Sequence, residues 1–177
     1  NAAIDAVRAE SDLPIIASLA FLEDGTTTGG NTISEVVSAL TARGVDVIGA
    51  NCSVGPNHML GIVESITASV RQSDRPATPV STMPNAGWPE HRNGRFIFSS
   101  APDYLGRFAN EAAGFGARIV GGCCGTTPDH IHQMRLHLDQ RTTANGYKGT
   151  NYLTPVTFDF AAEDEYQPTE LSKKLGN

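Results

Sequence analysis

The sequence predicts an α/β fold built on a parallel sheet, and three observations support this. Four short runs that are mostly apolar recur at similar intervals: their centres, Ile15, Val47, Val80 and Ile119, are 32, 33 and 39 residues apart. The runs are more continuously apolar than alternating, which is typical of strands buried on both faces. Helical patterns fill the gaps between them, and such strand–helix alternation favours a parallel sheet with helices outside it.

Each expected element has its own local signal. The strands are expected at residues 13–21, 45–51, 79–83 and 118–122. The helices show apolar stripes at helical spacing, and some begin with a proline in the first turn, where a missing N–H costs little. They are expected at residues 2–10, from Ile33 to a C-cap at Gly44, from Pro56 to about Val70, over Pro102–Phe115, and after an N-cap at Thr127. This pattern fits a flavodoxin-like open sheet or half of a (β/α)8 barrel, and composition does not choose between them.

Composition and charge exclude several function classes. The formal net charge is −6 and Lys and Arg do not cluster, so a nucleic acid or an anionic membrane is a poor partner. No stretch approaches the roughly 18 apolar residues of a membrane span. The chain has 3 cysteines, an odd number with one adjacent pair, which is a poor disulfide framework. We therefore expect a reduced, cytoplasmic protein.

The cysteines follow two of the expected strands. Cys52 comes directly after the second strand, and Cys123 and Cys124 come directly after the fourth. Because α/β folds place active sites at the carboxyl ends of parallel strands, we expect the three thiols on one rim. Three thiolates without a fourth protein ligand match a catalytic zinc site, and sulfur donors favour Zn²⁺ over Mg²⁺. The spacing alone favours a metal site and leaves open a redox dithiol or inert buried thiols.

Three thiolates also restrict the chemistry of such a site. With Zn²⁺ bound they leave a formal charge near −1, which makes the site a weak activator of water. A thiol substrate suits it better, because a thiol that coordinates the metal loses its proton outright. Without the metal only a few per cent of a free thiol is ionised at neutral pH.

Three motifs make the assignment more specific: Gly-Ala-Asn-Cys at residues 49–52, Pro-Asn-Ala-Gly at 84–87, and Gly-Gly-Cys-Cys-Gly-Thr-Thr-Pro at 121–128. In this order they resemble the homocysteine S-methyltransferase family. The resemblance implies a (β/α)8 TIM barrel with Cys52, Cys123 and Cys124 as ligands of Zn²⁺. Residues 1–140 would be the C-terminal half of this homocysteine-binding barrel, supplying about strands five to eight with their helices.

The resemblance also implies an activity, the transfer of a methyl group from a methyl donor to the thiolate of homocysteine, which gives methionine. Asn51 and Asn85 are then candidate substrate-binding residues, and Asn85 is placed to occupy or orient the fourth zinc position. The runs at residues 24–30 and 83–89 are similar to bacterial proteins that carry a C-terminal methylenetetrahydrofolate reductase domain. Residues 141–177 would be the connector towards that domain.

Other interpretations remain open at this stage. The chain would be a non-catalytic metal-binding fragment if activity requires the missing N-terminal half of the barrel. It would be a vicinal-dithiol redox protein if Cys123 and Cys124 oxidise reversibly. Ser53 and Thr126 are candidates to hydrogen-bond the cysteine sulfurs. None of the histidines is expected to be a zinc ligand, because their spacing on helices and loops does not bring them together.

Overall fold

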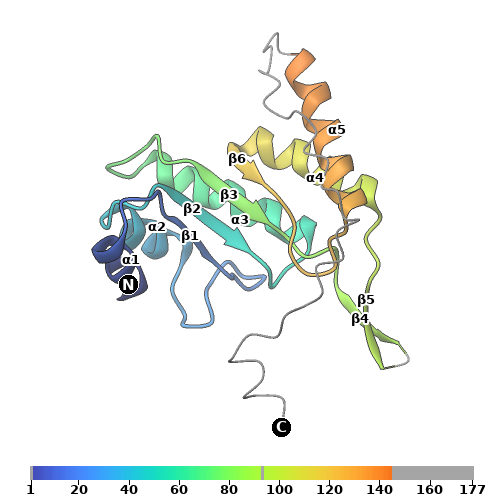
Figure 1. Ribbon diagram of the computed structural model, residues 1–177, viewed down its shortest axis with the longest axis horizontal. Helices are drawn as coiled ribbons and strands as arrows, with labels where there is room; N and C mark the ends of the chain where they lie inside the picture. The colour runs from blue at the N-terminus through green and yellow to red at the C-terminus, as the bar shows by residue number, and fades with distance from the viewer. Residues whose placement is uncertain (1, 93, 145–177) are drawn as a thin grey trace, which may run out of the picture.

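The computed structural model describes residues 2–92 and 94–144, in which helices and strands alternate as the sequence predicts (Figure 1). Every expected strand and helix is confirmed. The strands of the main sheet are β1 (Ile16–Leu19), β2 (Val47–Asn51), β3 (Val80–Met83) and β6 (Ala117–Val120). The helices are α1 (Ala2–Glu10), α2 (Ile33–Thr41), α3 (Pro56–Arg71), α4 (Pro102–Phe115) and α5 (Pro128–Ala144).

The main sheet is parallel throughout and has the order β1-β2-β3-β6. Its register aligns Ala17 with Ile48, Ile48 with Val80, and Val80 with Ala117. Because the strands run the same way, their carboxyl ends meet at one edge, although the pairing of β3 with β6 shifts its register between Val80 and Ser81. The loops after β2, β3 and β6 therefore lie side by side, and this arrangement brings distant parts of the sequence to one site.

One face of the sheet carries the main hydrophobic core. Ile48, Ala50 and Val80 point to this face and pack in one cluster with Val63 and Ile66 of α3. In Figure 1 the helices α2, α3 and α4 lie behind the sheet and cover this face. Burial of a side chain of this size contributes about 1.5–3 kcal/mol, so this layer is the main source of stability.

The opposite face has a different character. Ser18, Gly49 and Ser81 are neighbours across it, and a Cβ at Gly49 would collide with the Ser81 hydroxyl. Ile16 on the same face is 52% exposed. Within the part of the chain that the structure describes, no helix lies in front of this face in Figure 1. The serine side chains on either side occupy the space next to Gly49, so this position accepts no side chain.

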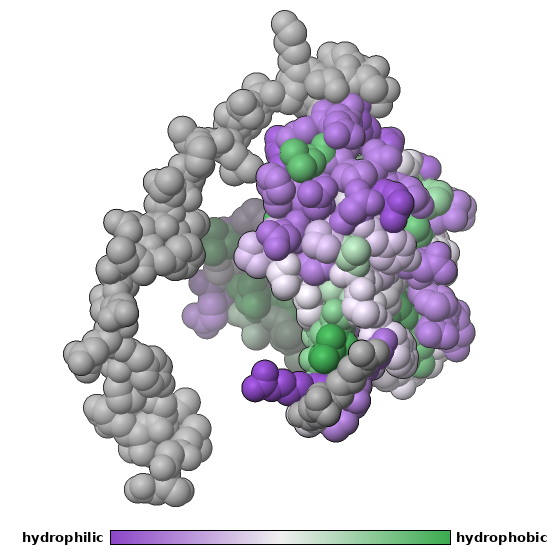
Figure 2. Space-filling model, turned by 90° about the vertical axis from the view of Figure 1, so that its right-hand side faces the viewer, coloured by the Kyte–Doolittle hydropathy of each residue, from purple (hydrophilic) through white to green (hydrophobic). Residues whose placement is uncertain are grey.

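The chain between β3 and α4 also contains a hairpin, whose two strands are not among those expected from the sequence. β4 (Pro89–Arg92) pairs in antiparallel fashion with β5 (Arg95–Phe98). Phe96 and the preceding Trp88 are 71% and 66% exposed. Figure 2 shows this side of the molecule, with a mainly hydrophilic surface over α5 at the top and hydrophobic side chains near the hairpin at the bottom.

The ends of some helices also differ from expectation. α2 ends at Thr41 with Ala42 as C-cap, and Gly44 adopts its positive φ of 66° two residues later. α5 continues to Ala144, past the expected boundary at 140, and the rest of the expected connector lies outside the described residues. No helix in the described part of the chain is both long and apolar enough to cross a membrane.

Candidate metal centre

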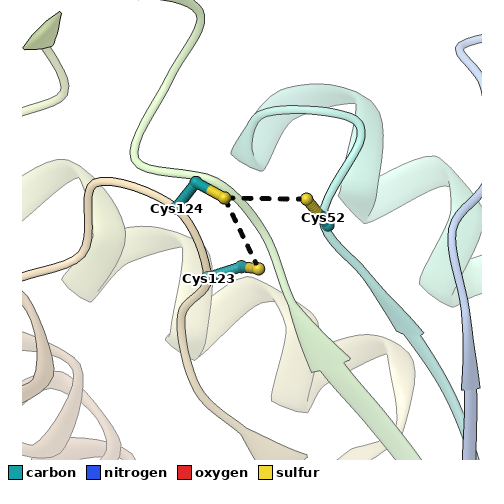
Figure 3. Close-up of side chains that lie close together, drawn as sticks. All are labelled: Cys52, Cys123 and Cys124. Carbon is teal, nitrogen blue, oxygen red and sulfur yellow. Dashed lines mark hydrogen bonds between the residues drawn. The ribbon is translucent and has the colours of Figure 1, made fainter. Parts of the chain in front are cut away.

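The three cysteines converge at the carboxyl edge of the sheet (Figure 3). The Sγ atoms of Cys52 and Cys124 are 3.8 Å apart, and those of Cys123 and Cys124 are 4.0 Å apart. All three sulfurs lie within 4.8 Å of one another, and all three thiols are free. The prediction that they share one rim is confirmed.

The spacing of the sulfurs fits a tetrahedral thiophilic metal. A Zn–S bond of about 2.3 Å and a tetrahedral angle place two thiolate ligands about 3.8 Å apart. The two measured distances, 3.8 and 4.0 Å, agree with this value. A fourth tetrahedral position would be left for another ligand. The donor set and its geometry therefore fit Zn²⁺.

Cys52 lies in a strained turn. Cys52 and Ser53 have φ angles of 57° and 60°, the left-handed region that residues other than glycine rarely adopt. The backbone N–H of Cys52 donates to the Met83 carbonyl at 2.9 Å, and the N–H of Val54 donates to the Cys52 carbonyl at 2.7 Å. Such a conformation costs about 1–2 kcal/mol per residue and persists when surrounding contacts enforce it. Here it turns the chain sharply so that the thiol reaches Cys124.

The segment after β3 fastens the two cysteine-bearing loops together. The N–H of Asn85 donates to the Val54 carbonyl at 3.1 Å, on the Cys52 side. On the other side, the N–H of Cys123 donates to the Pro84 carbonyl and the N–H of Ala86 donates to the Cys124 carbonyl, each at 2.8 Å. Figure 3 shows this segment passing between the two loops. The thiols are thus positioned by backbone hydrogen bonds.

The thiols differ in their ionisation. The backbone N–H of Ser53, more than any other group, holds the pKa of the Cys52 thiol below its usual value, and the amide of Asn85 contributes in the same direction. Burial raises the pKa of Cys123 to about 11, and its hydrogen bond with Cys52 adds to the rise. In the metal-free protein Cys52 is therefore the thiol that ionises more readily, while Cys123 stays protonated.

The two candidate asparagines lie on the same rim in different settings. Asn85 is 8% exposed, its amide contacts Cys52, and its Oδ1 has no hydrogen-bond partner. Asn51 ends β2, and its Oδ1 accepts a hydrogen bond from the Ser18 hydroxyl at 2.7 Å. The unpartnered, buried oxygen of Asn85 is unusual, because buried polar atoms normally have a partner.

The other polar residues near the cysteines have mixed roles. Ser53 contributes its backbone N–H to the Cys52 sulfur, as described above, so the expected contact exists through the main chain. The Thr126 hydroxyl has no partner, so the expected bond to a sulfur is absent. No histidine belongs to the cysteine group among the described residues, in agreement with the sequence analysis. His130 instead holds two backbone segments behind the cysteines, a role that the sequence analysis missed.

Comparison with known proteins identifies the family. The profile of the family described as homocysteine S-methyltransferase matches residues 1–138. The chain belongs to this family. It is 33% identical over 143 residues to a methionine synthase of Mycobacterium leprae and 37% identical over 128 residues to a methionine synthase of Mycobacterium tuberculosis. These alignments cover 80% and 72% of this chain but 11% and 10% of the two relatives.

Solved structures of the family share the fold. The homocysteine methyltransferase MmuM from Escherichia coli is similar in its oxidized form, with a TM-score of 0.59, and in its metallated form, with a TM-score of 0.58. Both are 20% identical in sequence to this chain. The matches cover 76% of this chain and 40% or 39% of the MmuM chain, so this sequence corresponds to less than half of that protein.

Proposed function

We propose that this chain carries the metal-binding part of a methyltransferase that transfers a methyl group to the thiolate of homocysteine and so forms methionine. The observation that carries the proposal is the cluster of three free thiols within 4.8 Å at the carboxyl edge of the sheet. Membership of the homocysteine S-methyltransferase family supports the same reaction. A zinc ion bound there would supply a Lewis acid that keeps the homocysteine sulfur ionised at neutral pH.

The residues of the chain prepare this site in three ways. Cys52, Cys123 and Cys124 would hold Zn²⁺ with their thiolates, since their sulfurs already have tetrahedral spacing. The Ser53 N–H stabilises the ionised form of Cys52, which favours loading of the metal. The segment after β3 fixes the two loops relative to each other, so little rearrangement is required on binding.

Asn85 and Asn51 are proposed to act on the substrate side. The amide of Asn85 contacts Cys52 and its Oδ1 has no partner, so this side chain is suited to the fourth position of the site until the substrate sulfur takes it. Asn51 ends β2 next to Cys52, and its amide nitrogen is suited to donate to a substrate carboxylate while Ser18 holds its oxygen. No general base is required, because coordination removes the thiol proton.

We further propose that residues 1–140 are the C-terminal half of a (β/α)8 barrel, with β1, β2, β3 and β6 as strands five to eight. The parallel sheet with helices on one face and a polar opposite face supports this, because the inner face of a barrel needs no helix. The N-terminal half would pair with the open edge of β1. A reductase domain after the connector at 141–177 remains a prediction.

Zinc stoichiometry of the reduced chain tests the proposal directly. We expect about one zinc per chain by elemental analysis, and we expect Cys123→Ser to lose the metal together with homocysteine-dependent methyl transfer. Activity should be measured with the N-terminal half of the barrel supplied on the same chain. Full retention of both zinc and activity in Cys123→Ser would contradict the assignment.

The same experiment separates the alternatives. Zinc binding without methyl transfer by the isolated chain would support the non-catalytic fragment, whereas turnover by the isolated chain would exclude it. A vicinal-dithiol protein would form a reversible disulfide between Cys123 and Cys124 and leave Cys52 unreactive. The geometry does not single out that pair, because Cys124 lies as close to Cys52, at 3.8 Å, as to Cys123, at 4.0 Å.

A further inference from the structure

A buried histidine lies behind the cysteine cluster without belonging to it. His130, in the first turn of α5, is 6% exposed. Its Nδ1 accepts the backbone N–H of Thr127 at 3.1 Å and lies 2.7 Å from the Thr127 hydroxyl. The backbone N–H can only donate, so the ring hydrogen lies on Nε2, which donates to the Ser100 carbonyl at 2.9 Å. The ring therefore joins the start of α5 to the segment that precedes α4.

A series of hydrogen bonds connects this histidine to Cys124. The N–H of Ser100 donates to the Ala86 carbonyl at 3.1 Å, and the N–H of Ala86 donates to the Cys124 carbonyl at 2.8 Å. From Cys124 the chain leads within three residues to Thr127, which contacts the His130 ring. We call this path, through His130, Ser100, Ala86 and Cys124, the relay.

Cys124 is the ligand that depends most on the relay. Cys52 and Cys123 donate their own N–H groups to Met83 and Pro84, at the end of β3 and just after it. Cys124 is the exposed member of the three. Its carbonyl accepts from the N–H of Ala86, and the Ala86 carbonyl accepts from the N–H of Ser100. The Ser100 carbonyl in turn accepts from Nε2 of His130.

We propose that His130 is a positioning residue that holds Cys124 in place for metal binding, acting through the backbone of Ser100 and Ala86. The inference rests on the proposed function in so far as it takes Cys124 to be a metal ligand. Outer partners of this kind change metal affinity about 10–100-fold when they are replaced. His130 itself touches no sulfur and has no part in the chemistry.

The first test needs no metal. His130→Asn keeps an acceptor for the Thr127 N–H and removes the donor that reaches Ser100. We expect the amides of Ala86 and Ser100 to exchange hydrogen at least tenfold faster in this variant, while the amide of Cys52, bonded to Met83, is unchanged. His132→Asn, an exposed position on the same helix, is the matched control. Unchanged exchange at Ala86 and Ser100 would overturn the relay, whether or not the chain binds zinc.

The second test measures zinc affinity in a double-mutant cycle. We expect His130→Asn to weaken zinc binding about 10–100-fold in the chain with all three cysteines and to have little effect in a Cys124→Ser background. A Co²⁺-loaded sample should lose thiolate charge-transfer intensity in His130→Asn and keep it in His132→Asn. Equal weakening in both backgrounds would mean that His130 only supports the fold, which overturns the proposal. Failure of the parent chain to bind metal, with altered exchange at Ala86, would instead contradict the proposed function.

Discussion

The loop that carries Cys52 and the loop that carries Cys123 and Cys124 reach the same site by different means. The first is a tight turn in which Cys52 and Ser53 adopt left-handed φ angles although neither is glycine. The second places glycine where the chain needs a positive φ, at Gly125 with 77°. Strain is thus concentrated at the single cysteine, whereas the paired cysteines lie in a loop whose glycines permit its path.

The difference extends to the chemistry of the thiols. The strained turn directs the Ser53 N–H at the Cys52 sulfur and lowers the pKa of that thiol. In the glycine-lined loop Cys123 is partly buried, and this burial raises its pKa to about 11. The first loop therefore favours the thiolate form of Cys52, and the second favours the protonated form of Cys123 in the metal-free protein.

The largest effect is expected at Gly125, where the second loop depends on the absence of a side chain. A Cβ there would overlap the Phe98 ring of β5, and the residue has a positive φ. Gly125→Ala should lower the free energy of unfolding by about 2–4 kcal/mol, from overpacking and left-handed strain together. We expect zinc affinity to fall at least tenfold, because Cys124 must shift with its neighbour. Chemical denaturation and zinc competition measure the two effects.

Gly94 offers a matched control in the hairpin. Its φ is 76°, nearly the same as at Gly125, but nothing lies within 4 Å of a Cβ built there. Gly94→Ala should therefore cost about 1 kcal/mol from backbone strain alone and leave zinc affinity unchanged. If Gly125→Ala and Gly94→Ala change the free energy of unfolding and the zinc affinity equally, the contact between Phe98 and the cysteine loop contributes nothing to the site.

The second effect concerns the reactivity of the thiols. In the metal-free protein Cys52 has a lowered pKa and Cys123 a pKa of about 11, so at pH 7.5 the ionised fraction of Cys52 is the larger by about a hundredfold or more. Thiolates of lower pKa are less nucleophilic, which reduces the advantage in rate to roughly tenfold. Alkylation followed by peptide mass spectrometry should show Cys52 modified before Cys123. Preferential modification of Cys123 would contradict the proposed contrast.

The pH dependence of zinc binding checks the same difference. The pKa of Cys123 is about 11, so this thiol is protonated at neutral pH. It must release its proton when it binds zinc. Zinc affinity should therefore rise with pH by at least tenfold per unit from pH 6 to 9. Titration at several pH values in a buffer that does not bind zinc gives the slope.

Much of the fold could be predicted because its signals are local. The apolar runs around Val47 and Val80 locate β2 and β3, and Pro102 and Phe115 mark both ends of α4. The hairpin was missed although its sequence carries a signal. Asn93-Gly94 is the dipeptide that two-residue hairpin turns favour, flanked here by residues that pair as β4 and β5.

The sequence predicts which cysteines come together in the candidate site. It does not predict the backbone turn and the hydrogen bonds that hold them there. Cys52, Cys123 and Cys124 follow strands of one parallel sheet, and that topology alone brings their loops to one edge. The left-handed turn at Cys52 leaves no mark in composition, since Ser and Cys have no preference for it. The function of His130 depends on the Ser100 carbonyl, 30 residues earlier in the chain, which no local pattern reveals.

The smallest expected effect is a change in the free energy of unfolding on substitution of Ser53. The sign of this change tests whether the turn is strained. Ser53 has a φ of 60°, so Ser53→Gly removes left-handed strain of about 1–2 kcal/mol and adds about 0.5–1 kcal/mol of backbone entropy cost. We expect a net gain of about 0.5 kcal/mol in the free energy of unfolding. Ser69→Gly, inside α3, should lose about 0.5 kcal/mol. Because glycine retains the N–H that faces the Cys52 sulfur, the alkylation rate of Cys52 should not change. A loss of stability in Ser53→Gly would mean that the turn is not strained, and the contrast between the two loops would then rest on their thiols alone.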